Sequence, residues 1–255
     1  MIQNILVLGA GSAGLLAAIT LKKKLPQIDV RVVRSSDLGV IGVGEGTTAS
    51  MPPFLFGYLG MSPAIFYARA EPTWKLGIHF LWGPRDHFDF TFSNQIDAQF
   101  TNLPRSNGFY AHEEFRWTDL NAALMAEGKA FARNPNGGGP DMNISFGFHI
   151  ENKKLVETLE TMAAELGVAF IEGKVRATER GPDGISALLL EDGQRLATDF
   201  FVDCSGFRSE LLGRALAEPY VSYDRALFCD RAVQEPREHA RTNRPATHSH
   251  HPYTL

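Results

Sequence analysis

Three short stretches of this chain combine residue types that can do chemistry. The first, GAGSAG at residues 9–14, has its glycines at the spacing of a dinucleotide-binding turn. The second, GVGEGTT at residues 42–48, joins flexible glycine backbone to a carboxylate and two hydroxyls. The third, EPTWKLGIHF, contains Lys75, an ammonium among apolar neighbours. Partial burial would shift the pKa of such a lysine while leaving it a strong hydrogen-bond donor.

The elements around the first stretch predict where it lies. Asn4–Gly9 is a short apolar run ended by glycine, which is typical of a buried parallel strand. Ser12–Leu25 is helical in composition and stops at Pro26. Asp29–Val33 has the composition of the next strand. The first 34 residues therefore predict one βαβ unit with a right-handed crossover.

Within this unit each glycine of the turn has a separate task. Gly9 permits the tight turn, Gly11 lets the backbone approach a pyrophosphate, and Gly14 lets helix and strand pack closely. The N–H groups of Ser12 and Ala13, at the helix N-terminus, favour negative charge. The pattern alone is weak evidence, but in this βαβ context it predicts a dinucleotide site.

The acidic residue expected after the second strand is replaced by Arg34, in VVRSSD. A carboxylate there normally binds a ribose hydroxyl, whereas an arginine can accept a 2′-phosphate. Arg34 is therefore compatible with NADP, or with FAD whose adenine stacks on the guanidinium. It is also compatible with an arginine that is simply solvated. Asp37 lies too far along the chain to replace the acid with ease.

The middle of the chain mixes helical and strand-like patterns. Phe54–Ala70 and Glu113–Ala132 predict helices. Trp74–Trp82 and His87–Ser93 alternate apolar and polar residues and predict antiparallel strands. Asn134–Asn143 is rich in glycine, proline and asparagine and predicts a loop.

The later part of the chain returns to strong periodic signals. Glu151–Gly167 has an apolar face at helical spacing and a glycine stop. A strand at residues 168–173 follows, and residues 174–200 predict an antiparallel meander with a turn at Asp192–Gly193. Phe200–Gly206 predicts another buried strand, followed by a short helix.

Composition excludes several classes of protein. A net charge of −4 gives no general attraction to nucleic acid or anionic membranes. The apolar run at the start is too short to span a bilayer and lacks the features of a signal peptide. The two cysteines, Cys204 and Cys229, form no disulfide framework, so we expect a cytoplasmic protein. Cys204 is expected to be a small buried apolar residue rather than a redox thiol.

Four motifs occur in a fixed order: the glycine turn, GVGEGT, the WKLGI strand around Lys75, and FFVDCSGFR at residues 200–208. In this combination the chain resembles the flavin-dependent tryptophan halogenases, from Ile5 to about Leu216. GVGEGT and DCSGFR are more specific than the glycine turn. The resemblance implies an α/β protein with a Rossmann-like FAD-binding fold of the flavin monooxygenase/halogenase type. An antiparallel β meander and inserted strands complete that fold.

The resemblance also implies a domain plan. Residues 1–233 would be the FAD-binding domain, with an inserted segment at about 74–145. Residues 234–255 would be an irregular tail leading to a substrate lobe that is missing from the chain. The family's W-x-W-x-I-P motif is absent, so we expect this chain to be the N-terminal, FAD-binding half. Apolar surface left by a missing lobe favours association, for example as a homodimer.

Several cofactor-binding residues follow from the resemblance, position by position. The isoalloxazine side of the FAD site would be lined by Gly44, Glu45, Gly46 and Thr47, and the adenosine side by Arg34 and Ser35, with the Val175 backbone at the adenine. Asp203 and Gly206 end the strand that returns toward the flavin. Asp203 would either bind the ribityl chain or cap a turn.

Lys75 matches the lysine that is essential in the family. There, reduced FAD (FADH2), O2 and chloride or bromide give hypohalous acid, which travels through the protein to that lysine. The lysine then donates a hydrogen bond to the acid or forms a haloamine, beside an aromatic substrate such as tryptophan or another indole. From the residues alone, Lys75 also fits a surface lysine on an edge strand, where lysines block aggregation.

The partners implied are a separate NAD(P)H-dependent flavin reductase and a small aromatic substrate, because no second dinucleotide motif is present. Two other functions stay open. One is an FAD-dependent monooxygenase or reductase that uses NADPH directly through Arg34. The other is a truncated, non-catalytic flavin-binding protein. His248, His250 and His251 have no completing ligand at a recognisable spacing, so no metal site is predicted.

Overall fold

The computed structural model describes residues 2–37, 39, 45–81, 86–93, 120–141 and 144–227, and residues 248–251 as a strand. The chain divides into two compact units. Unit 1 comprises Met1–Val43 and Asn152–Pro236, and unit 2 comprises Gly44–Glu151 and Arg237–Leu255.

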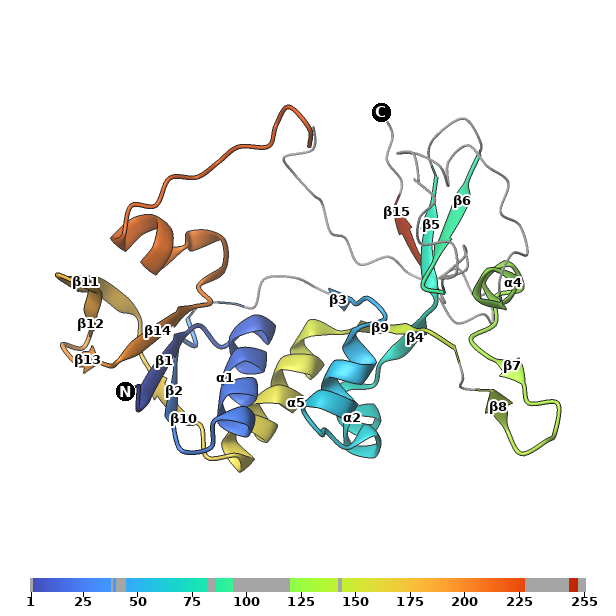
Figure 1. Ribbon diagram of the computed structural model, residues 1–255, viewed down its shortest axis with the longest axis horizontal. Helices are drawn as coiled ribbons and strands as arrows, with labels where there is room; N and C mark the ends of the chain where they lie inside the picture. Colours follow the sequence, from blue (N-terminus) through green and yellow to red (C-terminus); the bar gives the residue numbers. More distant parts are fainter. Residues whose placement is uncertain are drawn as a thin grey trace. The chain divides into compact units, whose positions relative to one another are not determined.

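A four-stranded parallel sheet forms the centre of unit 1 (Figure 1). Its order is β10-β2-β1-β14, with strands β10 (Ala169–Glu172), β2 (Asp29–Arg34), β1 (Asn4–Leu8) and β14 (Phe200–Asp203). The β1 strand is apolar on both faces because it is covered on both sides, as in other doubly covered parallel sheets. All four strands end at one edge, and the predicted βαβ unit opens the fold.

Two helices cover one face of this sheet (Figure 1). Helix α1 (Ser12–Lys24) packs against helix α5 (Asn152–Glu165). The predicted apolar face of α5 is buried at Leu155 and Leu159. These two helices close the core on the side toward which Ile5 and Val7 project.

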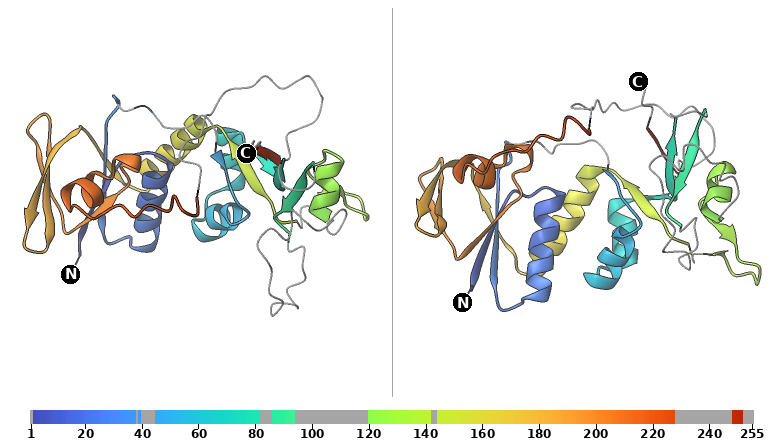
Figure 2. Two further views of the ribbon diagram at one scale, coloured as in Figure 1. Left: turned by 90° about the horizontal axis from the view of Figure 1, so that it is seen from above. Right: turned by 45° about the horizontal axis from the view of Figure 1, so that its top comes forward.

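The predicted meander covers the opposite face, as the views in Figures 1 and 2 agree. It consists of β11 (Val175–Gly181), β12 (Gly184–Leu190) and β13 (Arg195–Ala197). The two layers share one buried apolar cluster: Leu6, Leu8, Val33, Leu188, Leu190, Leu196 and Leu211. The short helix predicted after β14 is instead a 3₁₀ turn, η3 (Gly206–Arg208), followed by a π-type turn, η4 (Glu210–Ala215).

Unit 2 is built on small sheets, in which most strands pair antiparallel, rather than on one large sheet. The first has the order β3-β9-β4, with β3 (Glu45–Gly46), β9 (Gly147–Ile150) and β4 (Thr73–Lys75). The second has the order β15-β5-β6, with β15 (His248–His251), β5 (Gly77–Phe80) and β6 (Phe88–Thr91). Strands β7 (Ala132–Arg133) and β8 (Pro140–Asp141) form a hairpin.

The helices of unit 2 are shorter than predicted. The segment 54–70 is split into η1 (Pro53–Tyr58) and α2 (Pro63–Ala70), because Gly60 adopts a positive φ of 61° and Pro63 starts a new helix. Of the helix predicted at 113–132, the first seven residues lie outside the described residues, and α4 covers Leu120–Ala126. The prediction was wrong for 127–132, because Gly128 adopts a positive φ of 60° and ends the helix.

Two further features differ from the sequence-based expectation. The strand predicted at Trp74–Trp82 changes partner at Leu76: β4 pairs with β9, and β5 pairs with β6. Unit 2 also begins ahead of the expected insertion at 74–145, because β3 pairs with β9. In the expected irregular tail, β15 pairs in parallel with β5; residues 228–247 and 252–255 lie outside the described residues.

Candidate functional site

The glycine turn lies at the carboxyl end of β1, between the ends of β2 and β14. Gly9 has φ +107°, and its N–H donates to the Val33 carbonyl (2.9 Å). A Cβ at Gly9 would overlap the Cys204 carbonyl, and a Cβ at Gly14 would overlap the Gly9 carbonyl. Both glycines are therefore required by the fold itself, for backbone conformation and for the close approach of α1 to β1.

Gly11 differs from its two neighbours in this turn. A Cβ at Gly11 would meet no atom within 4 Å, and its φ of −73° is open to any residue. Packing within the protein thus gives no reason for glycine here, whereas a ligand backbone approaching the turn would. Helix α1 has no side-chain cap on Gly11 and no acidic residue in its first turn, so its N-terminal N–H groups suit a pyrophosphate.

Arg34 ends β2 at the same edge, and carboxylates hold its guanidinium. Nη1 donates to Glu160 Oε1 (2.7 Å) and Nε to Glu172 Oε2 (3.2 Å), while the guanidinium lies 5.0 Å from the centre of the Phe170 ring. The Ser36 N–H, followed by the Arg34 charge, holds the pKa of Glu172 below its usual range. Two paired carboxylates oppose a 2′-phosphate at this arginine, which weakens the NADP interpretation.

Asp203 caps a turn in this structure. Its Oδ1 accepts from the N–H and the hydroxyl of Ser205, and its Oδ2 accepts from the N–H groups of Leu211 and Leu212. Burial raises the pKa of Asp203, but these hydrogen bonds outweigh burial, so the pKa lies below its ordinary value. The carboxylate therefore has little acceptor capacity left for a ribityl chain, and the turn-capping alternative describes its contacts.

The other predicted residues of unit 1 gather at the same edge. Gly206 has φ +67° and starts η3, three residues after the end of β14 at Asp203. Ser35 follows Arg34, and the Gly173 N–H donates to the Arg34 carbonyl (2.8 Å), which brings the start of β11 at Val175 to the end of β2. The Val175 side chain packs on the cluster beneath the meander. The turn, Arg34, Val175 and Asp203 thus share one edge, where cofactor contacts by these residues remain a prediction.

In unit 2, Glu45 and Gly46 form β3, and Thr47 extends it; Gly44 lies outside the described residues. The Thr47 N–H donates to the Phe148 carbonyl, and the Thr47 hydroxyl accepts from the Phe148 N–H (both 2.8 Å). Thr47 is buried, so its side chain ties this loop to β9.

Lys75 belongs to the same sheet, on the other side of β9. It pairs in register with Gly147, where a Cβ would overlap the backbone and hydroxyl of Thr47. Thr47, at the end of the glycine-rich stretch, and Lys75 therefore both lie next to Gly147 of β9. The absence of a side chain at Gly147 allows this close approach.

The Lys75 side chain is only 5% exposed, which rules out a solvated lysine at the sheet edge. Its Nζ lies 5.5 Å from the centre of the Phe92 ring, a cation–π contact. Burial lowers its pKa from the ordinary value. Among the described residues no carboxylate forms an ion pair with Nζ. A buried ammonium without a countercharge is expensive for a fold, which favours a functional reason for it.

The sequence-based predictions did not include the residues that surround Arg34 and Lys75. Glu172 closes the apolar strand at FIEG, a signal that could have identified it as the acid beside Arg34. Glu160, on α5, gives no such signal. Phe92 and Asn121, which lie around Lys75, come from segments with no recognisable motif.

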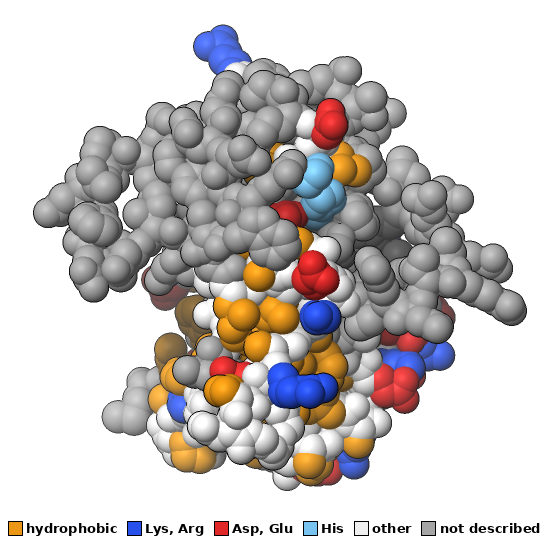
Figure 3. Space-filling model, turned by 90° about the vertical axis from the view of Figure 1, so that its right-hand side faces the viewer, with side chains coloured by type: hydrophobic (Ala, Val, Ile, Leu, Met, Phe, Trp, Pro, Cys, Tyr) orange, Lys and Arg blue, Asp and Glu red, His pale blue; other side chains and the backbone are white. Residues whose placement is uncertain are grey.

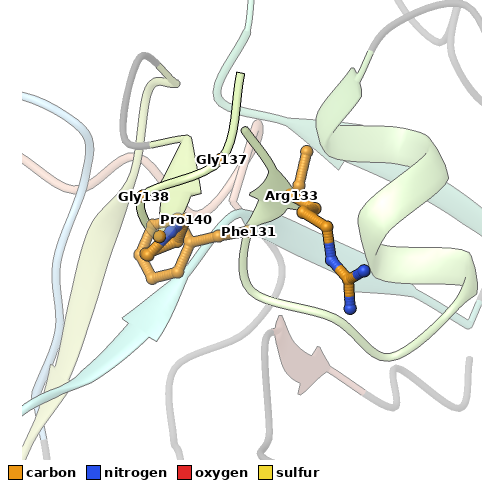
Figure 4. Close-up of a pocket in the computed structure, with 7 residues that line it drawn as sticks. Phe131, Arg133, Gly137, Gly138 and Pro140 are labelled. Carbon is orange, nitrogen blue, oxygen red and sulfur yellow. The ribbon is translucent and has the colours of Figure 1, made fainter. Parts of the chain in front are cut away.

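A depression of about 460 Å³ lies at the β7–β8 hairpin (Figure 4). Its lining includes Phe131, whose ring packs edge-on against Trp74 with centres 4.7 Å apart. Figure 4 shows the Phe131 ring beside Pro140, while the Arg133 guanidinium is directed away from both. Lys75 does not line this depression, which therefore adds nothing to its site.

The described surface shows no large patch of one charge on the face seen in Figure 3, where acidic, basic and apolar side chains are interspersed. Among the described residues, no group of three or more His, Cys, Asp or Glu side chains could hold a metal ion. No described helix is long and apolar enough to cross a membrane.

A parallel sheet with a glycine turn at its carboxyl edge, a meander on one face and an inserted unit defines a dinucleotide-binding α/β protein. The family model for tryptophan halogenases matches residues 4–253. The chain therefore belongs to the tryptophan halogenase family, a family of flavin-dependent oxidoreductase enzymes, and the resemblance seen in its sequence is confirmed.

Individual relatives agree with this assignment. The tryptophan 7-halogenase KtzQ of Kutzneria sp. (strain 744) is 28% identical over 256 residues, which cover 91% of this chain and 48% of KtzQ. The tryptophan 7-halogenase RebH of Lentzea aerocolonigenes is 27% identical over 255 residues, with the same coverage of 91% and 48%. The chain thus spans about half the length of the curated relatives it matches.

Solved structures confirm the predicted fold class. MibH, a lathipeptide tryptophan 5-halogenase, is 39% identical with a TM-score of 0.78 over 89% of this chain and 44% of MibH. Xcc4156, a flavin-dependent halogenase from Xanthomonas campestris, is 29% identical with a TM-score of 0.72 over 88% of this chain and 46% of Xcc4156. The fold is therefore the Rossmann-like α/β fold of flavin-dependent halogenases.

Proposed function

We propose that this chain is the FAD-binding part of a flavin-dependent halogenase that acts on an electron-rich arene such as tryptophan or another indole. The single observation that carries the proposal is the burial of Lys75, an ammonium that forms no ion pair among the described residues. The sequence resemblance matches this residue to the family's essential lysine. The name of MibH extends the candidate substrates to tryptophan within a peptide.

The cofactor proposed for unit 1 is FAD in its reduced form. The open position at Gly11 and the uncapped N-terminus of α1 fit a pyrophosphate, and Arg34 with Ser35 would hold the adenosine side. When bound, FADH2 together with chloride or bromide supplies the four electrons that reduce O2, giving hypohalous acid and water. A separate NAD(P)H-dependent flavin reductase would supply the FADH2.

Lys75 would direct the hypohalous acid to the arene. As an ammonium it donates a hydrogen bond to the acid's oxygen, which makes the halogen more electrophilic; as a neutral amine it exchanges a proton for the halogen and forms a haloamine. In either case the arene gains the halogen and loses a proton, and the oxygen of the hypohalous acid leaves as water. A pKa lowered by burial helps both routes, because it makes the ammonium a better proton donor and increases the neutral fraction.

The proposal is tested in a version of the protein extended to the length of its relatives. Lys75→Ala should abolish halogenated product, measured by mass spectrometry, while FAD affinity stays within about twofold of wild type, since the proposed pyrophosphate and adenosine contacts all come from unit 1. Halogenated product from the Lys75→Ala variant would remove Lys75 from this role.

Two competing functions are separated by simple assays. Mixing the FAD-loaded chain with NADPH should leave the flavin oxidised, because Glu160 and Glu172 oppose a 2′-phosphate at Arg34. Rapid bleaching of the flavin would instead favour a monooxygenase or reductase that uses NADPH directly. Reproducible bromination by the 255-residue chain itself would exclude a non-catalytic flavin-binding module.

A further inference from the structure

Asn121 is a buried polar side chain on α4, only 1% exposed. Its side-chain amide donates to two backbone carbonyls, those of Leu76 (3.2 Å) and Ser145 (2.7 Å). Two carbonyl oxygens can only be satisfied by the two hydrogens of an NH2 group, so the chemistry fixes the orientation of this amide. Asn121 therefore joins two strand segments that are distant in the sequence.

The Leu76 carbonyl accepts two hydrogen bonds at the point where two strands join. Leu76 is fully buried and lies where the chain leaves β4 and enters β5. Its carbonyl accepts from Asn121 and also from the Phe92 N–H (2.9 Å). A buried carbonyl at such a change of partner would otherwise lack a hydrogen bond, so Asn121 and Phe92 stabilise the break in the strand.

Both carbonyl groups that accept from Asn121 belong to residues near Lys75. Lys75 directly precedes Leu76, and Phe92, which bonds the same carbonyl, places its ring 5.5 Å from the Lys75 Nζ. Ser145, the second acceptor of Asn121, lies two residues before Gly147, the register partner of Lys75. Asn121 thus holds the backbone next to Lys75, at the end of β4, and the backbone just before its register partner in β9.

The packing around this junction leaves little freedom. A Cβ on Gly77 would lie 2.8 Å from the Thr91 Cα and 3.0 Å from the Met125 Sδ, so β5, β6 and α4 approach one another closely there. The backbone around Gly77 is packed too closely to shift easily. Loss of the Asn121 hydrogen bonds should therefore displace Lys75, the residue next to Leu76.

We propose that Asn121 is a positioning residue, which acts through the Leu76 carbonyl to hold the Lys75 ammonium against the Phe92 ring. Its importance for catalysis rests on the proposed function of Lys75, but the positioning itself does not. The proposal can therefore be tested on the 255-residue chain without any activity assay.

The test is competitive acetylation with acetic anhydride over a range of pH, with each lysine quantified by mass spectrometry. Exposed Lys153 is the internal reference. In wild type, Lys75 should react far more slowly than Lys153. In Asn121→Ala, acetylation of Lys75 relative to Lys153 should rise on the order of tenfold, comparable to losing one net hydrogen bond to a buried group. The midpoint of the Lys75 pH profile should also move toward its ordinary value.

Two further variants keep the result interpretable. Asn121→Leu fills a similar volume without a donor and should give the same rise if the alanine variant fails to fold. Thr158→Val is the matched control, because Thr158 is equally buried and donates to the Lys154 carbonyl in unit 1. It should lower the melting temperature without changing Lys75 acetylation.

Folded Asn121 variants with wild-type Lys75 acetylation and a wild-type pH profile would overturn the proposal and leave Asn121 with a structural role alone. Wild-type Lys75 reacting as fast as Lys153 would overturn it as well. In the extended protein, Asn121→Ala should lower kcat with little change in FAD affinity. Halogenation that survives Lys75→Ala would end the proposed function but would leave the acetylation result standing.

Discussion

The glycine turn of unit 1 and the Lys75 site of unit 2 are built in different ways. The turn is local: six consecutive residues, a strand before them and a helix after them set its shape. The Lys75 site is non-local, because its surroundings come from β4, β9, α4 and the segment after β6. A site formed by consecutive residues can be recognised from the sequence as a motif. The surroundings of a site formed by distant segments are known only from the folded structure.

The glycines of the turn offer the largest effect. Gly14→Ala should lower the free energy of unfolding by about 1–3 kcal/mol or more, since the new Cβ would overlap the Gly9 carbonyl. Gly11→Ala is the matched variant and should lower it by no more than about 1 kcal/mol, because alanine is a weaker N-cap but meets no protein atom. Urea unfolding measures both.

FAD affinity should separate the same two glycines. Gly11→Ala should weaken FAD binding by about tenfold or more, measured by flavin fluorescence, because its methyl group would occupy the space open to the pyrophosphate. Unchanged FAD affinity in this variant would show that the turn does not carry the cofactor.

Asp203 should have a smaller and pH-dependent effect. Its pKa in the folded protein lies below the ordinary value of 3.8, so its stabilisation is present above that pH and is lost as the pH falls further. Asp203→Asn should lower stability by about 1–2 kcal/mol at neutral pH, since the amide keeps one acceptor oxygen and puts an NH2 donor in place of the other, which loses two of the four hydrogen bonds. Melting temperatures should converge with wild type in strong acid; a constant difference would contradict the capping role.

Lys75→Met should change stability little or raise it, in contrast to the residues of the turn. The folded-state pKa of Lys75 is below its ordinary value of 10.5, so the buried charge destabilises the fold at neutral pH and less so as the pH rises toward that value. Removing the charge should raise the free energy of unfolding by zero to about 1 kcal/mol. The gain is small because the variant also loses the cation–π contact with Phe92. A loss of several kcal/mol would mean that Lys75 is structural.

Arg34 should show the smallest effect. Wild type should bind 2′,5′-ADP no better than 5′-AMP, because Glu160 and Glu172 neutralise the guanidinium. The double change Glu160→Gln and Glu172→Gln should shift the preference only modestly toward 2′,5′-ADP, as expected for solvent-screened charges. Calorimetric titration checks this, and a strong wild-type preference for the 2′-phosphate would restore the NADP interpretation.

The sequence predicted the elements with strong local signals: the βαβ unit, α5 and the meander. It did not predict the split of the strand at Leu76, because the choice between β9 and β6 as partner is made by distant segments. The environment of Arg34 was hidden for the same reason, since Glu160 and Glu172 lie 126 and 138 residues away in the sequence. Lys75 was found only through its motif, and its burial was not predictable from its own neighbours.

The most direct test of the account follows where the oxidised halide goes. The extended protein is supplied with FADH2, O2 and bromide, in the presence of the arene and of a dye that reacts with free hypobromous acid. Lys75→Ala should transfer the oxidised bromide from the arene to the dye while the sum of both products stays constant. Arene bromination that persists in this variant, or a fall in both products together, would contradict the account, in which the glycine turn binds the cofactor and Lys75 only directs the hypobromous acid to the arene.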